Sequence, residues 1–417
     1  MPLGLYISVP FCRTKCTYCN FASDVFSRAV FERYVDRVCA DIHSTPQIAT
    51  HMGGLLDPDA DSVYLGGGTP TVLDSQQLLR LFVTVKQNFR ILPGAEITVE
   101  CAPGTLTPNL LETLVESGVN RVSLGVQSFA DKEASSVGRL HKRATVLDDI
   151  ARLRQAGIEN ISIDLIAGLP HQSADSWRDS VESAIDLGVP HVSVYMLEID
   201  DDSRLGRELI AGGTRYHAHF VPDEELTAEF YESACEHLNA AGIAQYEISN
   251  FARGGSQSRH NLKYWTRQPY LGFGVDAHSM LRSANEQYEA VRFSTPDSLE
   301  QYVANAPLAH TKVSRQEALE ENLFLGLRLN DGIDLEEIRQ RFGAPSVNAI
   351  ASTIAELGSA GLIDRRLDRI RLTSRGRLLS NEVFERFLNC GETGVAPVPA
   401  RAEPSAGLGQ SARRSTG

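Results

Sequence analysis

A repeated junction between helices and strands is the feature of the sequence that most restricts its fold. VESGVNRVSL, RQAGIENISI and IDLGVPHVSV each contain a glycine (Gly118, Gly157 and Gly188) followed by an apolar residue and, shortly afterwards, a β-branched run. Glycine accepts the left-handed backbone conformation that closes a helix, and the apolar residue after it packs against the last helical turn. NAAGIAQYEI, with Gly242, is a fourth copy. The repeat predicts consecutive βα units.

Short β-branched runs alternate with amphipathic stretches through the first half of the chain. They begin at Leu5, Ser62, Glu96, Arg121, Ile161 and His191. Such alternation implies an α/β fold with a parallel sheet. Six units and a further strand favour a barrel or partial barrel over an open, doubly wound sheet, although periodicity alone does not separate the two. We expect this first domain to span residues 1–290.

After about residue 300 the pattern becomes helical and predicts a small winged-helix-like domain over residues 300–390. Helical stretches such as DLEEIRQRF precede a hairpin-like segment, IDRRLDRIRLTSRG, and a last helix, GRLLSNEVFERFL. Winged helices often bind DNA, but 40 basic against 53 acidic residues give a net charge of -13, which opposes binding to nucleic acid. We therefore expect a packing or partner-docking role. The tail, residues 391–417, is rich in Pro, Ala, Gly and Ser and is predicted to be disordered.

The composition also indicates a cytoplasmic protein. No apolar run approaches the roughly 20 residues needed to cross a bilayer, and the first residues lack the pattern of a secretion signal. Seven cysteines are too few for a disulfide scaffold in a chain of 417 residues. Three of them fall within eight residues, which favours metal binding in a reducing compartment.

The three clustered cysteines predict an iron-sulfur cluster. Cys12, Cys16 and Cys19 follow the first predicted strand directly and place three thiolates on one loop. Three thiolates can hold three irons of a 4Fe-4S cluster and leave the fourth iron without a protein ligand. A structural zinc site would need a fourth Cys or His at close spacing, but Asn20 and Phe21 follow. A zinc-stabilised interaction protein is the alternative interpretation.

The segment YISVPFCRTKCTYCNF resembles the cluster loop of radical S-adenosylmethionine (SAM) proteins. Within them it is similar to the branch of oxygen-independent coproporphyrinogen oxidases and HemW-type haem chaperones, and the similarity extends over most of the chain. The resemblance implies a partial (β/α)6 barrel and a 4Fe-4S cluster on Cys12, Cys16 and Cys19. It also implies SAM, whose amino and carboxylate groups chelate the open iron, and an electron donor for the cluster.

Glycines after the second strand are the first candidates for SAM binding. YLGGGTPT places Gly67, Gly68 and Thr69 there. Without a side chain, the backbone can approach a ligand closely and hydrogen-bond its ammonium and carboxylate groups. A simple glycine turn is the alternative, but the segment resembles the SAM-methionine motif of the family.

Polar residues near the ends of later strands are further candidates. Glu100, Gln127 and Asp164 end or closely follow the third, fourth and fifth strands, and Arg139 lies in the loop after the fourth. A carboxylate can accept from ribose hydroxyls or an ammonium, and Arg can pair with a carboxylate, although each residue could also be a solvated loop residue. By resemblance, VECAPG, SLGVQSF, GRLH and IDLIAGLP match segments that contact SAM, and Tyr6 and Tyr18 match cofactor-lining positions. Two departures are Ser8, where relatives usually have His, and Cys101-Ala102, where they have Ala-Asn.

Features that distinguish the two branches favour a haem chaperone. The oxidases carry a further Cys where this chain has Phe21, and a long N-terminal arm; because the motif starts at residue 6, we expect no such arm. The chaperones have a His-Asn-x-x-Tyr-Trp signature, which matches His260 to Trp265 here. A neutral imidazole can ligate haem iron, and Tyr264 and Trp265 offer flat faces to a porphyrin. Alternatively, His260 is a structural histidine that caps the barrel, and the aromatics are core.

Our hypothesis from the sequence is that the protein binds haem and passes it to an acceptor protein, while the cluster and SAM regulate the transfer. The alternative is an enzyme of porphyrin biosynthesis that oxidatively decarboxylates coproporphyrinogen III to protoporphyrinogen IX. Whether the protein is an enzyme is left open at this stage.

Overall fold

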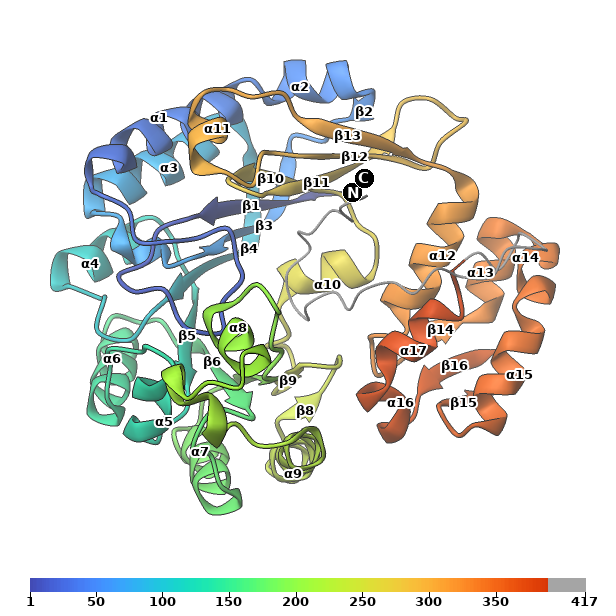
Figure 1. Ribbon diagram of the computed structural model, residues 1–417. Helices are drawn as coiled ribbons and strands as arrows, with labels where there is room; N and C mark the ends of the chain where they lie inside the picture. The colour runs from blue at the N-terminus through green and yellow to red at the C-terminus, as the bar shows by residue number, and fades with distance from the viewer. Residues whose placement is uncertain (389–417) are drawn as a thin grey trace.

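A computed structural model describes residues 1–388 and contains one large sheet with a parallel centre (Figure 1). The parallel strands are neighbours in the order β10-β1-β3-β4-β5-β6-β7. Their bounds are β1 (Leu3–Val9), β3 (Asp59–Gly67), β4 (Arg90–Cys101), β5 (Arg121–Gln127), β6 (Asn160–Ala167), β7 (His191–Met196) and β10 (Tyr270–Gly274). Within residues 1–388 no pairing joins the two ends of the sheet, so the barrel is not closed. The predicted α/β class with a parallel sheet is confirmed.

Antiparallel strands extend both edges of this sheet. Beside β10 lie β11 (His278–Ser283), β12 (Ala290–Ser294) and β13 (Ala309–Val313), and β2 (Gly54–Leu55) pairs with β11. Beside β7 lie β9 (Asn250–Ala252) and β8 (Ala244–Gln245). The sheet therefore continues past residue 290, where the sequence placed the end of the first domain. The Gly242 junction also differs from its three counterparts, because it leads to a two-residue strand that pairs antiparallel.

Helices between the parallel strands cover the outside of the sheet (Figure 1). They are α1 (Ala29–His43), α2 (Thr45–Met52), α3 (Ser75–Asn88), α4 (Pro108–Glu116), α5 (Asp131–Ser136), α6 (Arg143–Gln155), α7 (Ala174–Asp186) and α9 (Glu224–Ala240). Gly118, Gly157 and Gly188 have φ of 83°, 85° and 64°, as expected of glycines that end helices. Leu5 and Ile7 of β1 belong to the core, whereas Tyr6 between them lines a cavity inside the sheet. The alternation of strand side chains thus separates the apolar core from the polar interior.

The C-terminal region is helical with a small sheet of its own. It contains α12 (Arg315–Gly326), β14 (Ile333–Asp334), α13 (Leu335–Phe342), α14 (Ala344–Ala349), α15 (Ala351–Ser359), β15 (Ile363–Arg366), β16 (Arg369–Leu372), α16 (Ser374–Leu378) and α17 (Ser380–Glu385). Strands β15 and β16 form the predicted hairpin, and β14 pairs with β16. One apolar core joins these helices to Ile248, Tyr270 and Met280 of the barrel side. The C-terminal region therefore packs against the open side of the sheet.

The predicted disordered tail, residues 391–417, lies outside the described residues. None of the helices within residues 1–388 has both the length and the apolar character needed to span a bilayer.

Candidate cofactor site

A cavity of about 1150 Å³ opens where the parallel strands end. Its wall includes the cysteine loop, the glycine segment after β3, polar residues of β4, β5 and β6, and helix α10 (Arg259–Trp265). Every residue that the sequence proposed for the cluster, SAM or haem lines this cavity, except Trp265. Residues far apart in the sequence are therefore brought to one place, although this position alone does not establish their roles.

The cysteine loop follows β1 and is held in place by backbone contacts. The Cys12 N–H donates to the Asp24 carbonyl at 3.0 Å, and the Thr14 hydroxyl donates to the Gly138 carbonyl at 2.9 Å. Burial raises the pKa of the Cys12 and Cys19 thiols, so their thiolates need positive charge such as bound iron. In residues 1–388 no three His, Cys, Asp or Glu side chains converge on one metal ion. Three cysteines on one loop, each available to a separate iron, fit a 4Fe-4S cluster.

The glycine segment packs directly against the cysteine loop. The Gly68 N–H donates to the Val9 carbonyl, and the Thr69 N–H donates to the Phe11 carbonyl, both at 2.7 Å. A Cβ atom at Gly68 would lie 2.7 Å from the Phe11 oxygen and 3.0 Å from Cys12 Sγ. Gly68 must therefore lack a side chain for the two loops to meet. Gly67 has φ of 102°, a conformation that also favours glycine.

Two half-buried carboxylates lie on the inner face of the sheet. Glu100 accepts from the Tyr64 hydroxyl at 2.7 Å and from the Gly67 N–H at 3.2 Å. Asp164 accepts from the Ser123 hydroxyl at 3.1 Å. Burial raises the pKa of Glu100 to about 7 and also raises the pKa of Asp164. Each carboxylate therefore ionises more easily when a ligand donates hydrogen bonds or brings positive charge.

Gln127 and Arg139 carry buried polar atoms that have no partner. Gln127 lies at a register shift between β5 and β6 with φ of 68°, which turns its side chain into the cavity wall. Its Oε1 atom and the Arg139 Nε atom make no hydrogen bond, and Arg139 donates from Nη2 to the Tyr18 hydroxyl at 3.3 Å. Buried polar atoms are nearly always paired, so these two indicate a polar ligand. This is the observation by which the described residues fit SAM.

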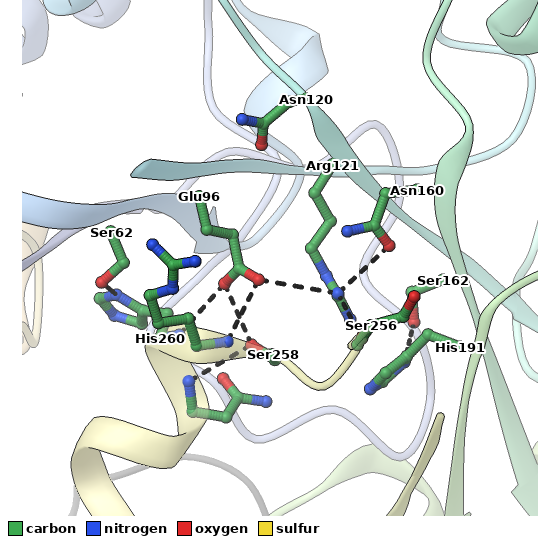
Figure 2. A network of polar contacts seen from close by, with 12 residues as sticks. Ser62, Glu96, Asn120, Arg121, Asn160, Ser162, His191, Ser256, Ser258 and His260 are labelled. Carbon is green, nitrogen blue, oxygen red and sulfur yellow. Dashed lines mark hydrogen bonds and ion pairs between the residues drawn. The ribbon is translucent and has the colours of Figure 1, made fainter. Parts of the chain in front are cut away.

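A polar network joins β4 and β5 to the start of α10, and apart from His260 its residues were not singled out from the sequence (Figure 2). The Arg121 Nη1 atom lies 3.7 Å from Glu96 Oε2 and donates to the Ser256 carbonyl at 2.8 Å. Glu96 also accepts the backbone N–H groups of Arg259 and His260, both at 3.1 Å. A carboxylate that accepts N–H groups at the start of a helix stabilises it, so Glu96 anchors the first turn of α10.

His260 lies inside this network with both ring nitrogens engaged. Its Nδ1 atom is 3.0 Å from the Ser62 hydroxyl, and its Nε2 atom is 2.9 Å from the Tyr264 hydroxyl. The residue is 1 % exposed, and burial lowers its pKa to about 3, so the imidazole is neutral. His260 lines the cavity, but ligation of haem iron would require one of these hydrogen bonds to break.

The two aromatics of the same motif have different surroundings. Tyr264 lines the cavity and packs edge-on against Tyr270 at 4.7 Å between ring centroids. Trp265 is 8 % exposed and lies under the Arg328 guanidinium, 4.3 Å from the ring centroid. The expectation that Trp265 offers a face to a porphyrin is not supported by this packing, because the ring belongs to the contact with the C-terminal region.

Part of the cavity wall was not anticipated from the sequence. It includes Asp276, in the turn before β11, His278, the first residue of β11, and Arg375, Leu378 and Leu379, in and just after α16. The polar pair in GFGVDAHSM was the one available signal. The C-terminal residues gave none, because their approach depends on how the two parts of the chain pack.

Comparison with known proteins gives two family matches. Residues 6–184 match the model of the radical SAM superfamily, and residues 313–379 match the HemN C-terminal domain. The heme chaperone HemW of Bacillus subtilis is 34% identical over 92% of this chain and 98% of its own length. The heme chaperones HemW of Lactococcus lactis and a Synechocystis strain are 32% and 36% identical, over 93% and 88% of this chain and 97% and 86% of their own lengths.

A solved structure has the same fold. Coproporphyrinogen III oxidase (HemN) from Escherichia coli, described as a radical SAM enzyme, superposes with a TM-score of 0.78. The superposition covers 93% of this chain and 90% of the oxidase chain, at 23% sequence identity. At this identity the similarity shows a shared fold.

Proposed function

Because the chain belongs to the HemW-type family of radical SAM proteins, we propose that it is a haem chaperone that binds haem, a 4Fe-4S cluster and SAM and transfers the haem to an acceptor protein. The proposal places the protein in the cytoplasm, where reducing conditions preserve free thiols. It also includes an electron donor for the cluster.

In this proposal Cys12, Cys16 and Cys19 bind three irons of the cluster and leave the fourth for the amino and carboxylate groups of SAM. A bound 4Fe-4S cluster supplies single electrons. The backbone of Gly67 to Thr69 borders the methionine part of SAM. The unpaired Gln127 and Arg139 atoms, with Glu100 and Asp164, offer hydrogen bonds to its polar groups. Tyr6 and Tyr18 complete the wall.

The haem assignment rests on one observation beyond the family: α10, which carries the His-Asn-x-x-Tyr-Trp motif, lines the same cavity as the cysteine loop. Ligand cavities in proteins commonly measure about 300–1,000 Å³, so a cavity of about 1150 Å³ has room for a second ligand beside SAM. We assign residues 1–290 to the cofactor sites and residues 300–390 to packing or partner docking, with the C-terminal region also closing the cavity.

Anaerobic haem titration of the cluster-loaded protein tests the proposal. We expect a shift of the Soret band that saturates near one haem per site. The bound haem should then leave for an added apo-haem protein faster than it is released into buffer. A protein that shows neither the shift nor the transfer is not a haem chaperone.

The alternative, oxidative decarboxylation of coproporphyrinogen III, is disfavoured by Phe21, which stands where the oxidases carry a further cysteine. An anaerobic assay with coproporphyrinogen III, SAM and a chemical reductant separates the two functions. Formation of protoporphyrinogen IX would replace the chaperone proposal with the enzymatic one.

A further inference from the structure

We propose that His278 supplies the imidazole that ligates haem iron, that Arg375 pairs with a haem propionate, and that His260 is a positioning residue that holds helix α10. This inference rests on the proposed haem binding and adds the place and the ligands of the haem.

The surroundings of His260 are those of a structural histidine. Both of its nitrogens are hydrogen-bonded, to Ser62 of β3 and to Tyr264 one turn later in α10. Iron at either nitrogen would leave one of these buried hydroxyls without its partner, which is unfavourable. The helix is fixed further by Lys263, whose ammonium lies 2.7 Å from Asp61 Oδ1 and donates to the Pro2 carbonyl at 3.0 Å. His260 thus belongs to the set of contacts that attach α10 to the barrel.

His278 has the opposite surroundings. Three histidines line the cavity in the described part of the chain, and of these His278 alone has no hydrogen bond on its ring: His141 pairs with the Val126 carbonyl, and His260 is bonded on both sides. The Nε2 atom of His278 is buried without a partner, yet the side chain as a whole is 28 % exposed. An imidazole in a cavity wall with unused nitrogens is available to a metal.

Asp276 lies beside this imidazole in the position of an orienting carboxylate. Its Oδ1 atom is 3.8 Å from His278 Nε2, and Asp276 itself lines the cavity. Metal-ligating histidines commonly direct their second nitrogen to a carboxylate, which fixes the ring and strengthens the ligand. Asp276 adopts φ of 54°, a conformation that Asp tolerates better than most residues, so the turn between β10 and β11 is shaped around this residue.

Other residues of the cavity wall that includes His278 offer groups suited to the rest of a haem molecule. The aromatic rings of Tyr264 and Tyr270 line the cavity. Leu378 and Leu379, half-buried apolar residues of the C-terminal region, line it as well. Arg375 is exposed at the same cavity and donates a long hydrogen bond, 3.3 Å, to the Ala360 carbonyl. An apolar plane, an imidazole and an exposed guanidinium correspond to the porphyrin ring, its iron and its propionates. SAM has no need of such a combination.

The test compares His278→Ala with His260→Ala in the full-length, cluster-loaded protein, with the exposed residue His51 changed to Ala as the matched control. Haem is titrated anaerobically, and the axial ligand is read from the Soret and visible bands and from EPR. We expect His278→Ala to weaken haem binding by at least about tenfold and to lose the histidine-ligated spectrum, with recovery on addition of imidazole. His260→Ala should lose stability in urea but keep the histidine-ligated spectrum. If His278→Ala keeps the wild-type spectrum and affinity, or if His260→Ala alone loses the histidine-ligated spectrum, the inference is wrong.

A second experiment tests the pairing of Arg375 with a haem propionate. Because Arg375 is exposed, its replacement should not prevent folding. Arg375→Ala is expected to weaken binding of haem but not of haem dimethyl ester, which lacks the propionate charges. An equal effect on both porphyrins, or on neither, contradicts the propionate assignment. Failure of the wild-type protein to bind haem would instead reject the proposed function itself, so the two failures are distinguishable.

Discussion

The Nε atom of Arg267 lies 2.7 Å from Oε2 of Glu321, and the two side chains are 2 % and 8 % exposed. Arg267 follows α10, whereas Glu321 belongs to α12, so the ion pair joins the end of α10 to the C-terminal region. Arg292 of β12 approaches the other oxygen of Glu321 at 2.8 Å. The position of α10 is thus set from both sides, by Glu96 in the barrel and by this ion pair at its far end.

Removal of one partner of this ion pair should destabilise the protein strongly. Because Arg267→Met leaves Glu321 buried with one fewer positive neighbour, we expect the free energy of unfolding in urea to fall by about 3–5 kcal/mol. Arg90→Met is the matched control, since that arginine pairs with Asp59 on the surface and its loss should have little effect on the free energy of unfolding. If both variants lose the same free energy of unfolding, the buried ion pair stabilises the protein no more than a surface pair does.

The cluster assignment predicts a selective effect of single cysteine changes. Cys16→Ser should abolish the visible absorbance of the reconstituted cluster and reduce bound iron and sulfide, because each cysteine holds a separate iron. Cys39→Ser, in α1, should retain the wild-type content, since Cys39 lies outside the cavity wall. Iron and acid-labile sulfide per chain measure the difference. The assignment is wrong if Cys16→Ser retains a full cluster.

The pKa of Glu100 predicts that SAM binding depends on pH. Burial raises this pKa to about 7, so the side chain is largely protonated below that pH and cannot accept two hydrogen bonds from a ligand as a carboxylate would. The affinity for SAM should therefore weaken as the pH falls through about 7, by at most about tenfold per pH unit. Calorimetric titration at several pH values measures it.

Glu100→Gln separates this effect from the titration of SAM itself. The amide cannot ionise, so any pH dependence that remains in the variant belongs to the ligand or to other groups. If wild type and variant show the same pH profile, Glu100 does not contact SAM as proposed.

Much of the fold could be predicted because its signals are local. Glycine junctions and β-branched runs each involve a few consecutive residues, and the parallel order of the strands follows from their alternation with helices. The Gly242 junction failed as a βα unit because β8 has two residues and pairs with the neighbouring β9 instead of with a parallel strand. A strand that short has no periodicity from which its direction could be read.

The candidate site divides in the same way. The cysteine loop and the glycine segment are each a short continuous stretch that directly follows a strand. Because the ends of parallel strands meet at one edge of a sheet, the approach of these two segments to one cavity was predictable. His278 and Arg375 were not identified, because one follows a turn with little pattern and the other comes from a region whose docking depends on buried contacts such as Arg267 with Glu321. The packing of Trp265 under Arg328 depends on the same docking, so the face that the ring presents could not be read from the motif.

The role of His260 in holding α10 predicts a specific dependence of stability on pH. Its pKa falls from 6.5 to about 3 on folding, so between these values the unfolded chain binds a proton that the folded chain excludes. The contribution is fully present above pH 6.5 and is lost as the pH falls towards about 3; between about pH 7 and pH 5 the loss amounts to about 2 kcal/mol. His260→Gln removes this contribution but not that of His191, whose pKa burial also lowers. The free energies of unfolding of wild type and His260→Gln, measured in urea at both pH values without the cluster, should therefore differ less at the lower pH. A constant difference would mean that His260 accepts a proton in the folded protein, and that its ring is not enclosed between Ser62 and Tyr264 in solution.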